Sequence, residues 1–216
     1  MYKLLNGCNH EIHFSDKKNV EYSGVAFLDR DGVIIKEKNY IKDPNDVEVN
    51  PGIKEVIEFL NRLNYKIIII TNQSGIERKF FSWKEYLSVT EQMIYLLGES
   101  AQINSIYACG AINTEKCSWR KPGIGMIYQG WSKGLLETKN SILIGDKSSD
   151  IETGIKSNIR NLFHLLTGHG ESEKDKVNKL IKDCSCINES RYLKDNSFFQ
   201  EKNLYDLLAI LKKLKV

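Results

Sequence analysis

The segment Val25-Ala26-Phe27-Leu28-Asp29-Arg30-Asp31-Gly32-Val33 joins a short apolar run to two acidic residues. Such a run is typical of a buried β-strand. Side chains on an extended segment alternate between two directions, so Asp29 and Asp31 are expected to point the same way. Such a pair could share one hard cation while one carboxylate oxygen attacks phosphorus. Taken alone, however, a short acidic pair is more often a turn or a helix cap.

The composition indicates a globular protein with a single domain. The 216 residues are enough to bury a core, with 27% charged and 41% hydrophobic residues. The net charge of +3 gives no indication of a nucleic-acid or membrane partner. No apolar run approaches the roughly 20 residues that span a bilayer, and the N-terminus lacks a secretory signal. We therefore expect a cytoplasmic protein whose five cysteines are reduced thiols.

Short apolar runs alternate with helical patterns along the chain. Four consecutive isoleucines at 67–70 predict a strand buried on both faces. Ser82 and Glu85 match a capping box and predict a helix over 82–97. Further strands are expected at 25–28, 103–109, 141–144 and 161–166, and further helices from about 53 to 63 and over 149–156. This alternation predicts an α/β fold, a doubly wound, Rossmann-like parallel sheet with helices on both faces.

The two ends of the chain carry weaker patterns. Residues 1–23 are expected to be an N-terminal extension, with a strand near 11–14 that could lengthen the sheet or support a dimer. Residues 24–216 are expected to form one domain that ends in an amphipathic C-terminal helix. Residues 171–200 are polar and are expected to be irregular, apart from a helical patch at 177–181.

Three polar motifs follow the expected strands. They are Thr71-Asn72-Gln73-Ser74-Gly75, Arg120-Lys121-Pro122-Gly123 and Gly145-Asp146-Lys147-Ser148-Ser149-Asp150. Each has a simple explanation on its own: a surface turn, a solvated pair of cations, and in Asp150 a charge at a helix N-terminus. Ligands of doubly wound sheets bind outside the carboxyl ends of the strands, where all of these motifs fall. Their joint occurrence therefore indicates one site.

These segments together resemble the haloacid dehalogenase (HAD) superfamily of phosphatases. The resemblance rests on four motifs: Phe27-Leu28-Asp29-Arg30-Asp31-Gly32-Val33-Ile34, Ile70-Thr71-Asn72-Gln73-Ser74-Gly75-Ile76, Arg120-Lys121-Pro122 with Gly125-Met126, and Ile144-Gly145-Asp146-Lys147-Ser148-Ser149-Asp150. They are most similar to the branch that contains D-glycero-D-manno-heptose 1,7-bisphosphate 7-phosphatases and histidinol-phosphatases. The resemblance covers roughly residues 25–168.

The resemblance implies a Mg²⁺-dependent reaction through an aspartyl-phosphate. Asp29 would be the nucleophile, and Asp31 would protonate the leaving oxygen and then activate water. Asp31 would need a hydrogen-bonded setting that keeps it protonated part of the time. Thr71 and Lys121 would hold the phosphoryl oxygens. Mg²⁺ would be held by Asp29, the backbone carbonyl of Asp31 and Asp146.

The resemblance also implies residues that contact the substrate. Arg120, whose guanidinium is a planar fork of donors, suits a polyol or a second phosphate. The segment 37–40 follows the nucleophile where this family places substrate contacts, although a solvated loop is an equally good interpretation. Besides Arg120, which is also expected among the catalytic residues, the expected contacts are Arg30, Glu37, Asn39, Tyr40, Asn72, Gln73, Ser74 and Lys147.

Spacing indicates that the enzyme has no cap domain. Asp31 and Thr71 are 40 residues apart, and Thr71 and Lys121 are 50 apart. Expected helices and strands occupy much of both intervals, which leaves no room for a separate lid of about 50 residues or more. The site should therefore be open, as in capless members of the superfamily.

One loop departs from the family pattern. Members of this branch often bind a structural zinc through Cys-x-His and Cys-x-Cys before the Arg-Lys-Pro motif. In this chain Cys109 and Cys117 remain, whereas Ala111 and Trp119 occupy the other two positions. A structural zinc requires four ligands, so we expect no zinc here, and a shorter loop packed around Trp119.

Three functions remain open at this point. The first is a Mg²⁺-dependent phosphatase that acts on a phosphorylated sugar in heptose synthesis, as a monomer or weak homodimer. The second has the same chemistry with histidinol phosphate or a nucleic-acid 3′-phosphate as substrate, and the balanced charge argues mildly against nucleic acid. The third is a non-catalytic module on the same fold.

Overall fold

The structure is a computed structural model of the chain. It describes residues 2–5, 7–14, 22–115, 117–132, 140–186 and 197–214. Within the described residues, no helix combines the length and the apolar character needed to cross a bilayer.

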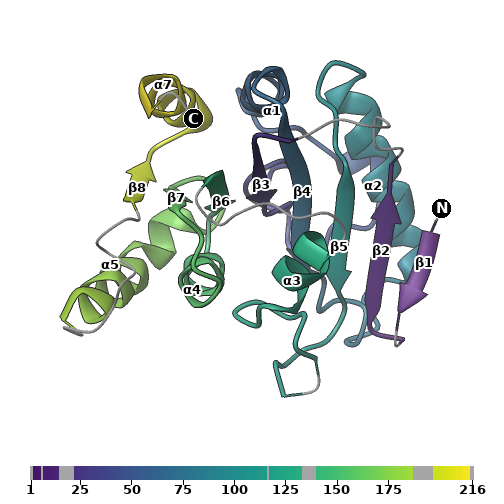
Figure 1. Cartoon of the computed structure of the whole chain (residues 1–216). Helices are drawn as coiled ribbons and strands as arrows, with labels where there is room; N and C mark the ends of the chain where they lie inside the picture. The colour runs from purple at the N-terminus through teal and green to yellow at the C-terminus, as the bar shows by residue number, and fades with distance from the viewer. Residues whose placement is uncertain are drawn as a thin grey trace.

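Eight strands form one sheet in the order β1-β2-β5-β4-β3-β6-β7-β8 (Figure 1). Their bounds are β1 Tyr2–Leu5, β2 Asn9–His13, β3 Gly24–Leu28, β4 Tyr65–Asn72, β5 Ser105–Cys109, β6 Ser141–Gly145, β7 Asn161–Leu165 and β8 Ser197–Glu201. The strands from β5 to β8 in this order are parallel to one another, whereas β1 and β2 run antiparallel. The expected parallel sheet is confirmed, with two antiparallel strands added at one edge.

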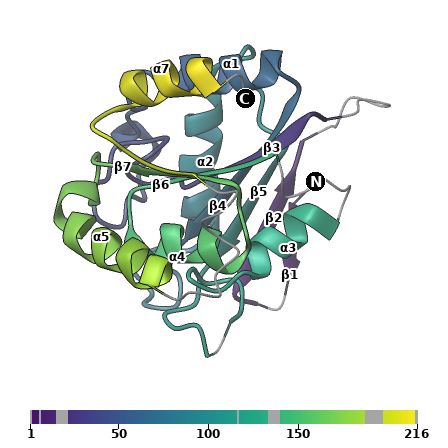
Figure 2. The same ribbon diagram turned by 60° about the vertical axis from the view of Figure 1, so that its left-hand side comes forward.

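Helices cover both faces of the sheet. The bounds are α1 Ile53–Arg62, α2 Trp83–Leu97, α3 Gly125–Ser132, α4 Ser148–Lys156, α5 Gly170–Cys186 and α7 Leu204–Leu214. Alternate residues of β3 face opposite sides: Ala26 and Leu28 pack with α1, α2 and α7, while Val25 and Phe27 pack with α3, α4 and α5. Figure 2 shows α1 and α7 above the sheet and α3, α4 and α5 below it. The doubly wound arrangement is therefore confirmed.

The capping box of α2 is also confirmed. Ser82 Oγ accepts a hydrogen bond from the backbone N–H of Glu85, and the Glu85 carboxylate accepts one from the backbone N–H of Ser82. Residues 29–64, all of which are described, hold only the short 3-10 helix η1 (Pro44–Asp46), α1 and two isolated bridges between β3 and β4. The site accordingly has no cap domain in this interval.

The N-terminal segment lengthens the sheet. Residues Asn9 to His13 of β2 pair with Cys109 to Ser105 of β5, and β1 pairs with β2. Of the two alternatives for the expected strand near 11–14, the structure thus shows the sheet extension.

The expectation that 171–200 is largely irregular is wrong. Helix α5 covers Gly170–Cys186, and β8 begins at Ser197. Residues 187–196 lie outside the described residues. The polar composition is misleading because α5 lies at the periphery and buries only a narrow stripe, with Val177 buried and Leu180 and Ile181 partly buried. Strand β8 is half-buried and lies at the edge of the sheet beside β7.

Candidate active site

The polar motifs meet at the carboxyl end of the parallel strands. They surround a cavity of about 270 Å³. Its lining residues are Asp29, Arg30, Asp31, Glu37, Asn39, Tyr40, Ile41, Asn72, Gln73, Ser74, Lys121, Lys147, Ser149, Asp150 and His169. The residues come from the loops after β3, β4, β6 and β7 and from the Arg-Lys-Pro loop, as expected for a doubly wound sheet.

Asp29 and Lys121 form an ion pair at the cavity floor. Lys121 Nζ lies 2.8 Å from Asp29 Oδ1 and 2.6 Å from Asp150 Oδ1, and it donates to the carbonyl of Ile70 at 2.9 Å. Asp29 Oδ1 also accepts the backbone N–H of Arg30 at 2.7 Å. These two donors hold the orientation of the Asp29 carboxylate.

Burial determines how this pair titrates. It raises the pKa of Asp29 to about 6, although the nearby charge of Lys121 acts in the opposite direction. For Lys121, burial lowers the pKa, but the carboxylates of Asp150 and Asp29 outweigh that effect and raise it overall. Lys121 therefore remains a cation inside the site.

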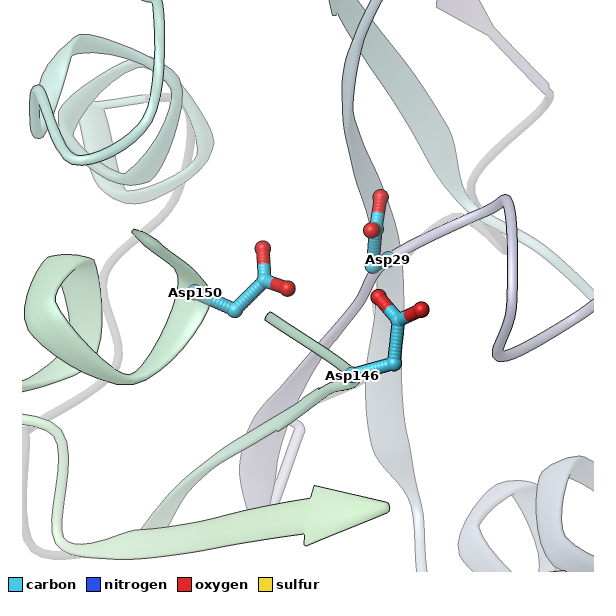
Figure 3. Close-up of side chains that lie close together, drawn as sticks. All are labelled: Asp29, Asp146 and Asp150. Carbon is cyan, nitrogen blue, oxygen red and sulfur yellow. The ribbon is translucent and has the colours of Figure 1, made fainter. Parts of the chain in front are cut away.

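Three aspartates converge beside this lysine. One carboxylate oxygen each of Asp29, Asp146 and Asp150 lies within 4.8 Å of the other two (Figure 3). Asp29 follows β3, Asp146 follows β6, and Asp150 belongs to the first turn of α4. All three residues are buried, so without a cation the cluster concentrates negative charge in a poorly solvated place.

Asp146 is the clearest indication that the cluster suits a metal. Its Oδ1 is buried and has no hydrogen-bond partner, and its Oδ2 accepts the backbone N–H of His169 at 2.8 Å. Burial and the charges of Asp29 and Asp150 raise the pKa of Asp146 to about 8. A set made only of oxygen ligands is what Mg²⁺ prefers, so these residues fit that ion.

Two glycines let the loops approach Asp146 closely. Gly32 and Gly168 have φ angles of +89° and +52°, and a Cβ on either would collide with Asp146 Oδ2. The left-handed backbone and the close approach both require glycine at these positions.

The metal cluster differs in one member from the expected set. The expected ligand set omits Asp150, for which a charge at a helix N-terminus is a sufficient explanation, and its Oδ2 does accept the backbone N–H of Lys147 at 3.0 Å. Its carboxylate, however, joins the aspartate cluster, and its Oδ1 contacts Lys121. The position of Asp150 one helical turn after Asp146 was the available signal. The role of the Asp31 carbonyl as a ligand stays a prediction.

Asp31 lies in a setting opposite to the one expected for it. Arg30 donates to the Asp31 carboxylate from Nε at 3.2 Å and from Nη2 at 3.0 Å, and Gln73 Nε2 donates to Oδ2 at 2.7 Å. Burial raises the pKa of Asp31, but Arg30 and these hydrogen bonds outweigh burial and lower it overall. Before substrate enters, this setting favours the ionised form of Asp31, and its role as an acid stays a prediction.

Arg30 is committed to contacts within the protein. Its side chain is buried, pairs with Asp31 and lies 5.1 Å from the ring centroid of Tyr86. Arg30 also lines the cavity, but these contacts favour a role in positioning Asp31 over a direct contact with substrate.

The polar motif after β4 contacts both Asp31 and the backbone of Lys121. Thr71 is buried below the cavity, and its Oγ1 accepts a hydrogen bond from Gln73 Nε2 at 2.8 Å. Asn72 holds the backbone of Lys121 with two hydrogen bonds of 3.0 Å, one to its carbonyl and one from its N–H. Asn72, Gln73 and Ser74 line the cavity as expected.

The rim carries a group of charged side chains. Glu37 Oε2 lies 3.3 Å from both Lys147 Nζ and His169 Nε2. Glu37 also accepts the backbone N–H of Asn39 at 2.9 Å, and Tyr40 contacts Phe80 edge to face with the ring centroids 4.7 Å apart. His169 was missed by sequence reasoning because nothing in its local sequence distinguishes it.

Arg120, like Thr71, is an expected catalytic residue that does not line the cavity. Its Nη1 donates to the carbonyl of Ala111 at 2.8 Å, and the half-buried side chain does not line the cavity. A contact between Arg120 and substrate thus stays a prediction that requires the side chain to leave Ala111.

The loop that departs from the family pattern packs around Trp119, as expected. Trp119 is buried and contacts Tyr107 edge to face, with the ring centroids 5.6 Å apart. Cys109 and Cys117 lie side by side, and Cys8 directly precedes β2, the strand that pairs with β5. The prediction that this loop holds no zinc is not tested by these contacts.

The fold and the aspartate-lysine site together define a phosphatase of the HAD type. The model of the polynucleotide kinase 3 phosphatase family matches residues 24–188, and the chain belongs to this family. It is therefore an enzyme, and the alternative of a non-catalytic module is set aside.

Curated relatives agree with this assignment, and a solved structure shares the fold. D-glycero-alpha-D-manno-heptose-1,7-bisphosphate 7-phosphatase of Photorhabdus laumondii is 41% identical, over 69% of this chain and 86% of the relative. The beta-anomer 7-phosphatase of Helicobacter pylori is 35% identical, over 65% and 82%. The D,D-heptose 1,7-bisphosphate phosphatase of B. bronchiseptica, solved with magnesium and phosphate, has a TM-score of 0.72 at 19% identity, over 88% and 98%.

Proposed function

We propose that this phosphatase is Mg²⁺-dependent and removes the 7-phosphate of D-glycero-D-manno-heptose 1,7-bisphosphate. The observation that carries the chemistry is the ion pair of Lys121 with Asp29 beside Asp146 and Asp150. The sugar substrate is supported by the names of relatives with up to 41% identity. A cytoplasmic enzyme of heptose synthesis that works as a monomer or weak homodimer remains part of this proposal.

In this mechanism Asp29 is the nucleophile. One carboxylate oxygen attacks phosphorus, the bond from phosphorus to the sugar oxygen breaks, and an aspartyl-phosphate forms on Asp29. The contacts of Asp29 Oδ1 with Lys121 Nζ and with the N–H of Arg30 fix the carboxylate before substrate arrives. Pre-orientation of this kind removes part of the entropic cost of the reaction.

Asp29, Asp146 and Asp150 would hold the metal, with the carbonyl of Asp31 as a further ligand. Mg²⁺ bound there would offset the repulsion between these carboxylates and the phosphoryl group. Lys121, which remains charged in the buried site, would stabilise the negative charge on the transferring group. Thr71 is proposed to assist in the same way, although its hydroxyl now accepts from Gln73.

Asp31 would serve as general acid and base. It begins as a carboxylate held by Arg30 and Gln73, so it must gain a proton before the sugar oxygen leaves. A phosphoryl dianion that enters beside Asp31 would raise its pKa and favour that proton. After the sugar leaves, Asp31 would accept a proton from the water that hydrolyses the aspartyl-phosphate.

The rim would select the substrate. Lys147 and His169 flank Glu37, so this side of the cavity offers an ammonium group and an imidazole for an anionic group and a carboxylate for hydroxyl groups. Arg30, Asn39, Tyr40, Asn72, Gln73 and Ser74 complete the proposed lining. A small phosphorylated sugar suits the cavity of about 270 Å³ better than a polynucleotide does.

A polynucleotide 3′-phosphate is the second candidate, because the matched family model carries that description. The test compares kcat/KM for both anomers of heptose 1,7-bisphosphate, histidinol phosphate and an oligonucleotide 3′-phosphate, with Asp29→Asn as the blank. The proposal predicts that one heptose anomer exceeds the other compounds by at least about 100-fold. A higher value for histidinol phosphate or the oligonucleotide would overturn the substrate assignment and leave the chemistry intact.

A further inference from the structure

Three cysteines lie next to the loop that carries the catalytic lysine. Cys109 ends β5, Cys117 lies four residues before Lys121, and Cys8 precedes β2. The Sγ atoms of Cys109 and Cys117 are 3.4 Å apart, and both residues are buried. Cys8 Sγ and Cys117 Sγ both contact Oδ1 of Asn9, at 3.3 Å and 2.9 Å.

The two neighbouring thiols differ in how readily they ionise. Burial raises the pKa of Cys117, but hydrogen bonds with the backbone of Trp119 and with the Cys109 thiol outweigh burial and lower it overall. Burial raises the pKa of Cys109. Since the thiolate is the reactive form, Cys117 is suited to react with an oxidant and Cys109 is suited to follow as a thiol.

The cysteine thiols are arranged as a reactive pair, Cys109 and Cys117, and not as a metal centre. In the described part of the chain, the one group of three potential ligands whose atoms all lie within 4.8 Å of one another is the aspartate cluster. The three thiols do not converge in this way, and a structural zinc would also need a fourth ligand. Cys117 Sγ lies 3.4 Å from Cys109 Sγ, and Cys117 also contacts Cys8, both through a side-chain hydrogen bond and through their shared partner Asn9.

We propose that Cys109 and Cys117 form a reversible disulfide when a hydroperoxide reaches them. The Cys117 thiolate attacks the peroxide, the oxygen–oxygen bond breaks, and Cys117 becomes a sulfenic acid. The sulfur of Cys109 then attacks the Cys117 sulfur, the sulfur–oxygen bond breaks, and water leaves. Overall, two thiols lose two electrons and two protons, and one hydrogen peroxide becomes two waters.

The disulfide would change the active site through the backbone. A disulfide has a sulfur–sulfur distance of about 2.05 Å, so the bond would draw Cys117 toward β5. The Cys117 carbonyl accepts the N–H of Arg120 at 3.1 Å, and the next residue, Lys121, is clamped by Asn72. Displacement of this loop would move Lys121 relative to Asp29, which lies 2.8 Å from it.

The experiment treats the reduced full-length protein with hydrogen peroxide, followed by alkylation and peptide mapping by mass spectrometry. The proposal predicts a linked peptide pair containing Cys109 and Cys117, a loss of two free thiols per chain, and reversal by dithiothreitol. The Cys117→Ser and Cys109→Ser variants should lose this link, whereas the control variants Cys8→Ser and Cys184→Ser should keep it.

Activity gives a second measurement, which rests on the proposed function. We expect oxidation to lower kcat by about tenfold to 100-fold in the wild type and not in Cys117→Ser, because misplacement of catalytic groups by about 1 Å has effects of this size. Peptide mapping of the wild type requires neither the variants nor the substrate. The disulfide can therefore be detected even if the proposed function is wrong. A Cys8–Cys117 link, an irreversible sulfinic acid without a link, or a stoichiometric metal on the thiols would each overturn the proposal.

Discussion

Lys121 Nζ lies 2.8 Å from Oδ1 of Asp29, and both side chains are almost fully buried. A buried cation is tolerated only where carboxylates compensate it, and Asp150 supplies the second carboxylate at 2.6 Å. The lysine thus keeps its charge and fixes the nucleophile. The remaining features of the site depend on this pair.

Removal of the Lys121 ammonium group should lower kcat far more than it weakens substrate binding. We expect Lys121→Met to lower kcat by at least about 100-fold, because a preorganised charge in a dry site contributes about 3–4 kcal/mol to the transition state. The control is Lys156→Met, since Lys156 is half-exposed on α4 and pairs only with Glu152. Equal turnover by the two variants would show that Lys121 has no role in the chemistry.

The stability of the metal-free protein should fall as the pH rises from 6 to 8. Burial raises the pKa of Asp29 to about 6 and of Asp146 to about 8, whereas unfolded aspartate has a pKa of about 4. The folded chain therefore binds more protons than the unfolded chain in this range. The contribution of Asp29 and Asp146 to the free energy of unfolding is fully present below about pH 4. It is lost as the pH rises through the pKa values of the folded state.

Mg²⁺ should reverse this loss. The ion binds the ionised carboxylates of the folded protein only, so it should raise the Tm more at pH 8 than at pH 6. Calorimetry in EDTA and in excess Mg²⁺ measures both effects, and an Asp146→Asn variant should lose most of the difference. A Tm increase that is the same at both pH values would contradict the assignment of these raised pKa values.

Gln73 should influence the pH dependence of kcat through the pKa of Asp31. Its Nε2 donates to the Asp31 carboxylate at 2.7 Å and helps to lower the pKa of that group. In Gln73→Leu we expect the pKa of Asp31 to rise, so the basic limb of the kcat profile should move to higher pH while the maximum falls. Gln102→Leu is the control, because this glutamine is exposed near α2. An unshifted basic limb would exclude Asp31 as the proton donor.

The purified protein should contain well below one zinc per chain. Ala111 and Trp119 cannot ligate a metal, and the thiols of Cys8, Cys109 and Cys117 are one ligand short of the four that a structural zinc requires. Elemental analysis of protein purified without chelator measures this directly. Stoichiometric zinc that Cys117→Ser abolishes would show that Cys8 or another residue completes a site in this loop.

The sheet could be predicted from the sequence because its central strands are continuous apolar runs. Ile67 to Ile70 form the middle of β4, and the segment after Val25 forms β3 with both aspartates at its end. Such strands are dictated by burial on both faces, which a local pattern reveals. The peripheral α5 and β8 bury little apolar surface, so their sequences carry no comparable signal.

The site was predictable where a residue follows a strand, and less so where its role comes from distant contacts. Asp29, Asp31, Lys121 and Asp146 were found in this way. The contact of Asp150 with Lys121 and the position of His169 beside Glu37 join segments far apart in the chain, and the hydrogen bond from Arg120 to the carbonyl of Ala111 spans nine residues. No local spacing records such contacts, and Asp31 shows that a neighbour as close as Arg30 can reverse an expected pKa direction.

The most direct test of the central claim is Mg²⁺-dependent phosphate release by Asp29→Asn. We expect turnover to fall to the rate measured without enzyme, because an amide cannot form the aspartyl-phosphate, while the circular dichroism spectrum and cooperative unfolding are retained. Undiminished turnover by the folded variant would contradict Asp29 as the nucleophile.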